Sequence, residues 1–258
     1  MIVLKIGGSQ VVSPEMEAVW AYVRAVREAG TPILLVHGGG PQSTVLAKQL
    51  GHTPEVIQGR RVTTDLDLQI VQWVIRGELN SRLAAQAYAA GIAAVGISGV
   101  DSGLVTVTRR PPVMVGGRLV DFGWVGDVVE VRPELPQAIM QAGYTPIIAT
   151  MGVDAQGQIF NVNGDTVALH IAQAVRADRL LLLTDSGGLR KNVDDPASHF
   201  PVCNRALIED GIAQGWIQGG MMVKVKEALK ALDGGIGEVL MIRAGDVLSP
   251  EKGTRIIA

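Results

Sequence analysis

The chain has 258 residues, 47% of them hydrophobic, which is enough for one large domain or two small ones with a sizeable core. Its 23 Lys and Arg against 25 Asp and Glu give a net charge of −2, so nothing in the charge favours binding to nucleic acid or to an anionic membrane. A single cysteine, Cys203, rules out an internal disulfide, and neither a secretory signal nor an apolar run of about 18 residues is present, so we expect a cytoplasmic protein.

The first half of the chain alternates short apolar runs with helical patterns. We expect strands at 1–6, 32–37 and 93–98 and helices at 13–30, 41–51 and 64–90, the last interrupted near Gly77. Ser13 and Pro14 suit the start of a helix, and Gly30 suits its end. Residues 104–131 combine Thr, Val and Gly without a helical period, which predicts hairpins.

The second half continues this alternation. We expect helices at 133–142, 164–177, 205–215 and 220–233, strands at 145–150, 179–184 and 238–242, and a hairpin at 153–162. Residues 185–204 form a long polar loop. Buried strands that alternate with helices predict an α/β fold, a mostly parallel central sheet covered by helices on both faces. In such sheets, ligands bind at the carboxyl ends of the strands.

Glycine-rich turns follow four of the predicted strands, at 7–8, 38–40, 99 and 187–188. Glycine lets backbone N–H groups approach an anion closely, and the N-terminus of a following helix favours negative charge. One such turn is more often structural, whereas two on successive strands favour phosphate binding. Neither a P-loop nor a dinucleotide-binding G-x-G-x-x-G motif is present.

Two predicted elements carry lysines that could reach a bound anion. Lys5 lies in a strand that should be buried, where an ammonium group is costly unless it contacts an anion or reaches water at the strand edge. Lys224 and Lys226 flank the apolar stripe of the helix at 220–233. Position and periodicity leave open which of these lysines faces a site.

Other polar residues stand where loops enter helices. Asn161, Asn163 and Asp165 lie at such a point, where an N-cap and a first-turn acid would explain the last two. Arg60 and Arg61 precede another helix and could hold a carboxylate or simply carry surface charge. The four histidines show no metal-ligand spacing, so no protein metal site is predicted.

Taken together and in order, these pieces resemble the amino acid kinase family over nearly the whole chain. The segments that carry the resemblance are KIGGS (5–9), VHGGGPQ (36–42), GRRVT (59–63), VDFGWVGDVVEV (120–131), NVNGD (161–165), LLLTDSGGL (181–189) and GGMMVKV (219–225). The resemblance implies a three-layer α/β/α sandwich and transfer of the γ-phosphoryl group of MgATP to a carboxylate. The match is nearest to members that act on N-acetyl-L-glutamate in arginine biosynthesis.

The resemblance also assigns roles to residues. Lys5 and Lys224 would neutralise the migrating phosphoryl group, and Asp165 would orient both lysines. The residues implied to bind the acceptor are Gly39, Gly40, Arg61 and Asn161. The residues implied to bind the nucleotide are Gly7, Gly8, Thr184, Asp185, Ser186, Gly187, Gly188, Leu189, Trp216, Ile217 and Gln218. Mg²⁺ would be held mainly through the nucleotide phosphates.

The resemblance further implies an organisation and leaves two alternatives. Residues 1–175 would bind the acceptor and residues 176–258 the nucleotide, within one compact domain. Arginine-inhibited members carry an extra N-terminal helix that the first predicted strand, at 1–6, leaves no room for, so we expect an arginine-insensitive homodimer. The alternatives are a kinase for carrier-linked aminoadipate or glutamate and a nucleotide-binding regulator without chemistry. VDFGWVGDV favours free N-acetyl-L-glutamate.

Overall fold

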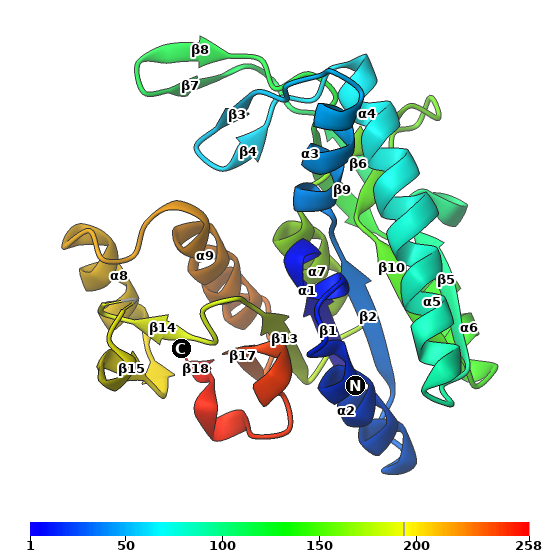
Figure 1. The fold of residues 1–258 in the computed structure, drawn as a ribbon, viewed down its shortest axis with the longest axis vertical. Coiled ribbons are helices and arrows are strands. Elements are labelled where there is room, and N and C mark those ends of the chain that lie inside the picture. The colour runs from blue at the N-terminus through cyan, green and yellow to red at the C-terminus, as the bar shows by residue number, and fades with distance from the viewer. Residues whose placement is uncertain (193, 258) are drawn as a thin grey trace.

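The computed structural model describes residues 1–192 and 194–257 and is built on an eight-stranded central sheet (Figure 1). In spatial order its strands are β16 (Val202–Cys203), β18 (Thr254–Ile256), β17 (Glu238–Ile242), β13 (Arg179–Leu183), β1 (Ile2–Ile6), β2 (Ile33–His37), β10 (Thr145–Ala149) and β5 (Ala94–Ser98). The strands from β17 to β5 run parallel, and β18 pairs antiparallel with β17. The predicted, mostly parallel sheet is confirmed.

Helices cover both faces of this sheet, which confirms the three-layer α/β/α architecture. One face packs against α2 (Met16–Glu28), α3 (Gly40–Gln49), α4 (Asp65–Val71), the π-helical η1 (Gln72–Leu79) and α5 (Asn80–Ala89). The other face packs against α6 (Glu134–Gln141), α7 (Gly164–Ala174), α8 (Arg205–Ala213) and α9 (Gly219–Asp233). Because side chains alternate along a strand, Leu4 and Ile6 of β1 face the α2 layer and Val3 faces the α7 layer. Lys5 shares the α7 side.

A second, four-stranded sheet lies beside α7. Its order is β12 (Ile159–Asn161), β11 (Met151–Val153), β6 (Val105–Arg109) and β9 (Gly126–Val131). Two hairpins extend from this region, β3 (Val56–Ile57) with β4 (Arg60–Arg61) and β7 (Val113–Val115) with β8 (Arg118–Val120), and Figure 1 shows both at the top of the molecule. Ile57, Val113 and Val115 pack on one small apolar cluster, so the hairpins support each other.

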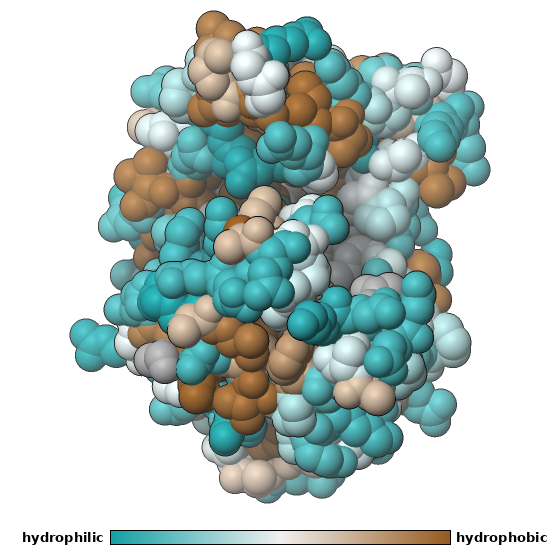
Figure 2. All heavy atoms as spheres, turned by 90° about the vertical axis from the view of Figure 1, so that its left-hand side faces the viewer, coloured by the Kyte–Doolittle hydropathy of each residue, from teal (hydrophilic) through white to brown (hydrophobic). Residues whose placement is uncertain are grey.

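The face that carries these hairpins is shown in Figure 2. Hydrophobic side chains gather at its top, where Figure 1 places the hairpins, and hydrophilic side chains cover much of its middle. Met114 and Leu119 of the β7–β8 hairpin are among the exposed apolar residues. No helix among residues 1–192 and 194–257 is both long enough and apolar enough to cross a membrane.

Three local predictions differ from the structure. The helix expected from Ser13 is instead a short helix, α1 (Gly8–Val11), a turn, and then α2 from Met16, because the Ser13 hydroxyl accepts the Glu15 N–H within the turn. The interruption expected near Gly77 is a widening of the helix into π-helical turns, not a break. The loop expected at 185–204 contains the small hairpin of β14 (Leu189–Arg190) and β15 (His199–Phe200).

Candidate active site

A cluster of three charged side chains lies at the carboxyl ends of the central strands. Lys5 Nζ is 2.7 Å from Asp165 Oδ1, and Lys224 Nζ donates to Asp165 Oδ2 at 2.6 Å. Lys5 comes from the end of β1, Asp165 from the first turn of α7 and Lys224 from the first turns of α9. Lys226 lies exposed on the far side of the stripe, so the structure answers which lysine of α9 faces the cluster.

Burial makes this arrangement electrostatically unusual. The side chains of Lys5 and Asp165 are 7% and 8% exposed. Burial alone would raise the pKa of Asp165, but the ammonium groups of Lys5 and Lys224 hold that pKa well below its ordinary value. Burial, and then the charge of Lys5, lowers the pKa of Lys224. One carboxylate thus keeps two ammonium groups together, leaving a net positive charge for an anion.

Two glycine turns pack against each other beside this cluster. A Cβ on Gly8 would lie 2.8 Å from Pro41 Cδ and 3.1 Å from Gly39 Cα, and a Cβ on Gly39 would lie 2.5 Å from Leu79 Cδ1. Glycine is therefore required at both positions by close approach. Gln42 Nε2 donates to the Gly8 carbonyl at 2.6 Å and ties the turns together. Gly7 links β1 to α1.

His37 contacts the second of these turns, at 38–40, through its imidazole ring. It ends β2 with its ring fully buried, and burial lowers its pKa to about 4, so the imidazole is neutral at pH 7. Its Nδ1 is 3.1 Å from the Gly38 carbonyl and its Nε2 is 3.0 Å from Asn80 Nδ2. The Asn80 amide can only donate, so we assign the proton of the ring to Nδ1.

A cavity of about 180 Å³ opens next to the cluster. Its walls include the turn at 38–40, Arg61 and Asn161, which places three of the predicted acceptor-binding segments around one space. The N-termini of α3 and α7 also border it, through Gly40 and Gly164. Backbone N–H groups at helix N-termini suit an anionic ligand.

Arg61 is held at the cavity wall by its own contacts. Its Nη2 donates to the Gly40 carbonyl at 3.2 Å and to Thr44 Oγ1 at 2.5 Å, and its Nη1 donates to Asp67 Oδ1 at 3.3 Å. Asp67 is fixed in turn by a reciprocal capping box with Thr64 at the start of α4. Asn161 Nδ2 donates to Thr63 Oγ1 at 3.1 Å, which joins β12 to the segment that follows Arg61.

The loop after β13 faces a separate cavity of about 380 Å³, which is lined by residues from the C-terminal part of the chain. Its walls include Ser186, Gly188, Leu189, Trp216 and Gln218, all predicted to bind nucleotide. Two more of the predicted residues, Thr184 and Ile217, are buried. Thr184 is buried and its hydroxyl accepts the Gly187 N–H at 3.1 Å. Ile217 is buried in the core, so its side chain faces away from solvent.

Asp185 joins the two halves of the site. Its carboxylate accepts the Ser9 hydroxyl at 2.9 and 3.0 Å and also accepts an N–H of the Gln10 side chain. The loop predicted to bind nucleotide is thereby bonded to the helix that follows Gly7 and Gly8. Among residues 1–192 and 194–257, no three His, Cys, Asp or Glu side chains gather in a group that could hold a metal ion.

Comparison with known proteins agrees with this geometry. A model of the amino acid kinase family matches residues 1–242. The chain belongs to the amino acid kinase family. It is 41% identical over 244 residues to the acetylglutamate kinase of Anaeromyxobacter dehalogenans (strain 2CP-C), covering 93% of this chain and 90% of that one. It is 39% identical over 241 residues to the acetylglutamate kinase of Methanopyrus kandleri, covering 93% and 94%.

Solved structures show the same amino acid kinase fold. The structure of smu.665 from Streptococcus mutans UA159 has a TM-score of 0.86 at 25% identity and covers 100% of this chain and 98% of that one. A carbamate kinase from Giardia has a TM-score of 0.67 at 17% identity, again over 100% and 98%, and shows the fold alone. The predicted fold class and family are both confirmed.

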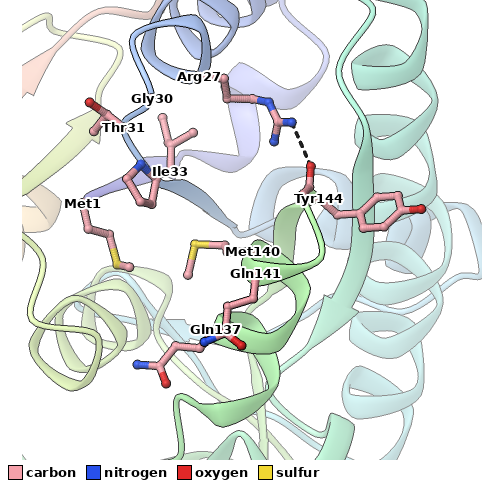
Figure 3. Close-up of a pocket in the computed structure, with 11 residues that line it drawn as sticks. Met1, Arg27, Gly30, Thr31, Ile33, Gln137, Met140, Gln141 and Tyr144 are labelled. Carbon is pink, nitrogen blue, oxygen red and sulfur yellow. Dashed lines mark hydrogen bonds between the residues drawn. The ribbon is translucent and has the colours of Figure 1, made fainter.

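A larger cavity, of about 600 Å³, lies at the opposite end of the central sheet, where its parallel strands begin (Figure 3). Its walls include Met1, Ile33 and Tyr144, which lie at or just before the starts of β1, β2 and β10. Arg27 reaches across it and donates to the Gly143 carbonyl at 2.9 Å. Because parallel sheets bind ligands at their carboxyl ends, this cavity is not the candidate active site.

Several residues that shape the candidate site were not predicted from the sequence. They are Ser9, Gln10, Thr44, Asp67, Arg110 and Thr150. One of them carried a local signal: Thr64 and Asp67 have the spacing of a capping box ahead of an apolar run. The others act through contacts distant in sequence, such as the 176-residue separation of Ser9 and Asp185.

Proposed function

We propose that this chain transfers the γ-phosphoryl group of MgATP to the side-chain carboxylate of N-acetyl-L-glutamate, giving ADP and an acyl phosphate in arginine biosynthesis. The observation that carries the proposal is the Lys5–Asp165–Lys224 cluster, placed between an arginine-lined cavity and the loop after β13. The two acetylglutamate kinases described above support the choice of acceptor.

The residues suit a reaction that needs charge neutralisation more than proton transfer. The attacking group is a carboxylate, which is ionised at neutral pH and needs no general base. Its oxygen forms a bond to the γ-phosphorus while the bond from that phosphorus to the bridging oxygen of ADP breaks. In this scheme Lys5 and Lys224 stabilise the charge on the transferring oxygens. Asp165 keeps the two ammonium groups close at a tolerable energetic cost.

The two cavities suggest where each substrate binds. We assign the acceptor to the 180 Å³ cavity, with Gly39, Gly40, Arg61 and Asn161 as its contacts, and more broadly to residues 1–175. We assign the nucleotide to the loop from Thr184 to Leu189 and the segment from Trp216 to Gln218, within residues 176–258. Gly7 and Gly8 would then supply backbone N–H donors to the phosphates at the junction.

Magnesium enters this scheme as part of the MgATP substrate. The described residues offer no group of three metal-binding side chains, so the phosphate oxygens and water would supply most of the ligands.

We also propose a cytoplasmic homodimer. Trp73 of η1 and Tyr88 of the following α5 are exposed, α5 packs beside β5 at one edge of the central sheet, and both aromatic side chains would be covered in a dimer. Gel filtration with light scattering measures this directly: a mass near twice 27.2 kDa is expected, and a monomer would contradict it.

The experiment for the activity is trapping of the acyl phosphate with hydroxylamine. Purified protein is incubated with ATP, Mg²⁺ and N-acetyl-L-glutamate, and hydroxamate and ADP should form in equal amounts. Free glutamate and a carrier-linked glutamate serve as alternative acceptors. Hydroxamate with the carrier-linked acceptor alone would make this a kinase of a different acceptor, and no ADP with any acceptor would contradict kinase activity.

A further inference from the structure

The wall of the acceptor cavity carries three arginines, Arg60, Arg61 and Arg110, and no acidic residue. Their surroundings differ, and the difference decides where an anion in the cavity is drawn. Asp67, outside the wall, sits behind Arg61, and Asp127 sits beside Arg110.

Arg61 and Arg110 are already neutralised. Asp67 is 1% exposed, and although burial would raise its pKa, hydrogen bonds from Thr64 and His52 lower that pKa below its ordinary value. It is therefore ionised at pH 7, 3.3 Å from Arg61 Nη1. Arg110 donates to Asp127 Oδ1 through both Nε and Nη2. Each pair has little net charge, so neither offers a strong long-range attraction to a ligand.

Arg60 differs from both. Within the described parts of the chain, no acidic side chain lies within ion-pair distance of Arg60, and no hydrogen bond engages its guanidinium. It is exposed at the lip of the cavity, where a charge keeps its hydration until a ligand arrives. The uncompensated positive charge of the cavity wall is therefore that of Arg60.

The backbone around Arg60 is fixed, which gives its side chain a defined origin. Gln58 and Gly59 both have positive φ, +48° and +78°, as a two-residue hairpin turn requires. Arg60 pairs with Ile57, and at the base of the hairpin the Thr63 N–H donates to the Phe122 carbonyl at 2.9 Å. The hairpin thus presents Arg60 from a turn that is bonded to the body of the protein.

We infer that Arg60 is a specificity-determining residue that binds the non-reacting carboxylate of the acceptor together with Arg61. The inference rests on the proposed function, in which the acceptor is a dicarboxylate with one carboxylate directed to Lys5 and Lys224. Arg61 supplies a fixed position for the second carboxylate, and Arg60 supplies the charge. A planar guanidinium can bind a carboxylate through two parallel N–H···O bonds.

The experiment combines a change in the protein with a change in the ligand. Arg60→Ala, Arg60→Lys and the wild type are compared with N-acetyl-L-glutamate and with its α-amide, which lacks the negative charge at the non-reacting end. Arg118→Ala, an exposed arginine on the neighbouring β8, is the matched control. Dissociation constants come from calorimetry, and KM and kcat come from the hydroxylamine assay.

Arg60→Ala should weaken binding of N-acetyl-L-glutamate about tenfold and raise its KM similarly, as expected for loss of one hydrogen bond between charged groups. Its kcat and its KM for ATP should stay within about twofold of the wild type, and Arg60→Lys should be intermediate. The α-amide should bind the wild type and Arg60→Ala equally. In the wild type, binding should weaken with added salt more than in Arg60→Ala.

Equal weakening for both acceptors, no weakening, or the same loss in Arg118→Ala would overturn the role of Arg60. Failure of the proposed function has a different signature. If the wild type binds N-acetyl-L-glutamate in an Arg60-dependent way but forms no hydroxamate, Arg60 stands as a ligand-binding residue and the kinase proposal falls. If the wild type does not bind N-acetyl-L-glutamate, both fall.

Discussion

Lys5 and Arg60 are two cations of the proposed active site, and the fold holds them in opposite ways. Lys5 lies on a central strand, buried, with its ammonium 2.7 Å from Asp165. Arg60 lies on a two-residue strand at the edge of a cavity, exposed, with no acid near it in the described chain. One is fixed by the core of the protein and the other by a short turn.

The difference follows from the cost of burying charge. An ammonium group in a central strand would be strongly destabilising without a carboxylate, so Lys5 requires Asp165 as a partner in the folded protein. Arg60 stays hydrated and needs no partner for folding. Removal of the Asp165 carboxylate should therefore lower stability, removal of one of its two ammonium partners should lower kcat with little effect on stability, and changes at the rim should alter KM alone.

The largest effect is expected on replacing Lys5. Lys5→Met keeps the length of the side chain and removes its charge, so kcat should fall roughly 10³-fold, the size seen when one electrostatic contact to a transition state is lost. Asp165 keeps Lys224 as a partner, so the melting temperature should stay near that of the wild type. Lys226→Met, on the exposed side of α9, is the control and should retain full activity. Loss of less than tenfold in kcat would contradict the role of Lys5.

Asp165→Asn tests how much the buried cluster contributes to the stability of the protein. It leaves Lys5 and Lys224 without their carboxylate, which should lower the free energy of unfolding at pH 7 by about 3 kcal/mol. Because the folded-state pKa of Asp165 lies below its ordinary 3.8, its contribution is present above pH 3.8 and is lost as the pH falls further. Urea denaturation should show that the difference in free energy of unfolding between the wild type and the variant becomes smaller as the pH falls below 3.8. The same difference in free energy of unfolding at every pH would contradict a stabilising role for the ion pairs of Asp165.

His37 is a buried titratable group that forms no ion pair with any residue in the described ranges 1–192 and 194–257. Its pKa is about 4 in the folded protein against 6.5 ordinarily, so the unfolded chain binds a proton between these values and the folded protein does not. Stability should therefore fall as the pH drops from 6.5 to 4, by on the order of 3 kcal/mol from this group. His37→Gln should show a flatter dependence over this range in urea denaturation. The same slope in both proteins would mean that His37 is protonated in the fold.

The smallest effect is expected at Thr44, near the rim. Thr44→Val removes the hydroxyl that accepts an Arg61 N–H and keeps the shape of the side chain. Arg61 retains Asp67 and the Gly40 carbonyl, so KM for the acceptor should rise only about threefold, the effect of roughly 0.6 kcal/mol, with kcat unchanged. A tenfold fall in kcat would show that this rim contact extends its influence to the buried cluster.

Much of the fold could be predicted because local sequence patterns determine most of its helices and strands. Short apolar runs such as that of β1, alternating with helical patterns, predicted the parallel sheet that the structure shows. The strand β18 was missed because three residues at a sheet edge carry too little pattern, and its position depends on pairing with β17. The helix start predicted at Ser13 was wrong because a hydroxyl that can cap a helix can equally accept a hydrogen bond in a turn.

The residues of the candidate site could be proposed from the sequence and the resemblance, but their contacts could not. Locally, Asp165 reads as an ordinary first-turn acid, and only the resemblance to a family joined it to Lys5 and Lys224. The fold brings these residues together over separations of 160 and 59 positions, which no local pattern encodes. The contrast between Arg60 and Arg61 depends on Asp67, six residues beyond Arg61, and on how the hairpin folds over the cavity.

The most direct test of the account is a crystal structure with ADP, Mg²⁺, a planar phosphoryl mimic such as aluminium fluoride, and N-acetyl-L-glutamate. Lys5 Nζ and Lys224 Nζ should both lie within about 3 Å of the mimic, one toward the acceptor and one toward ADP. Either ammonium pointing into solvent, with the mimic bound elsewhere, would contradict it.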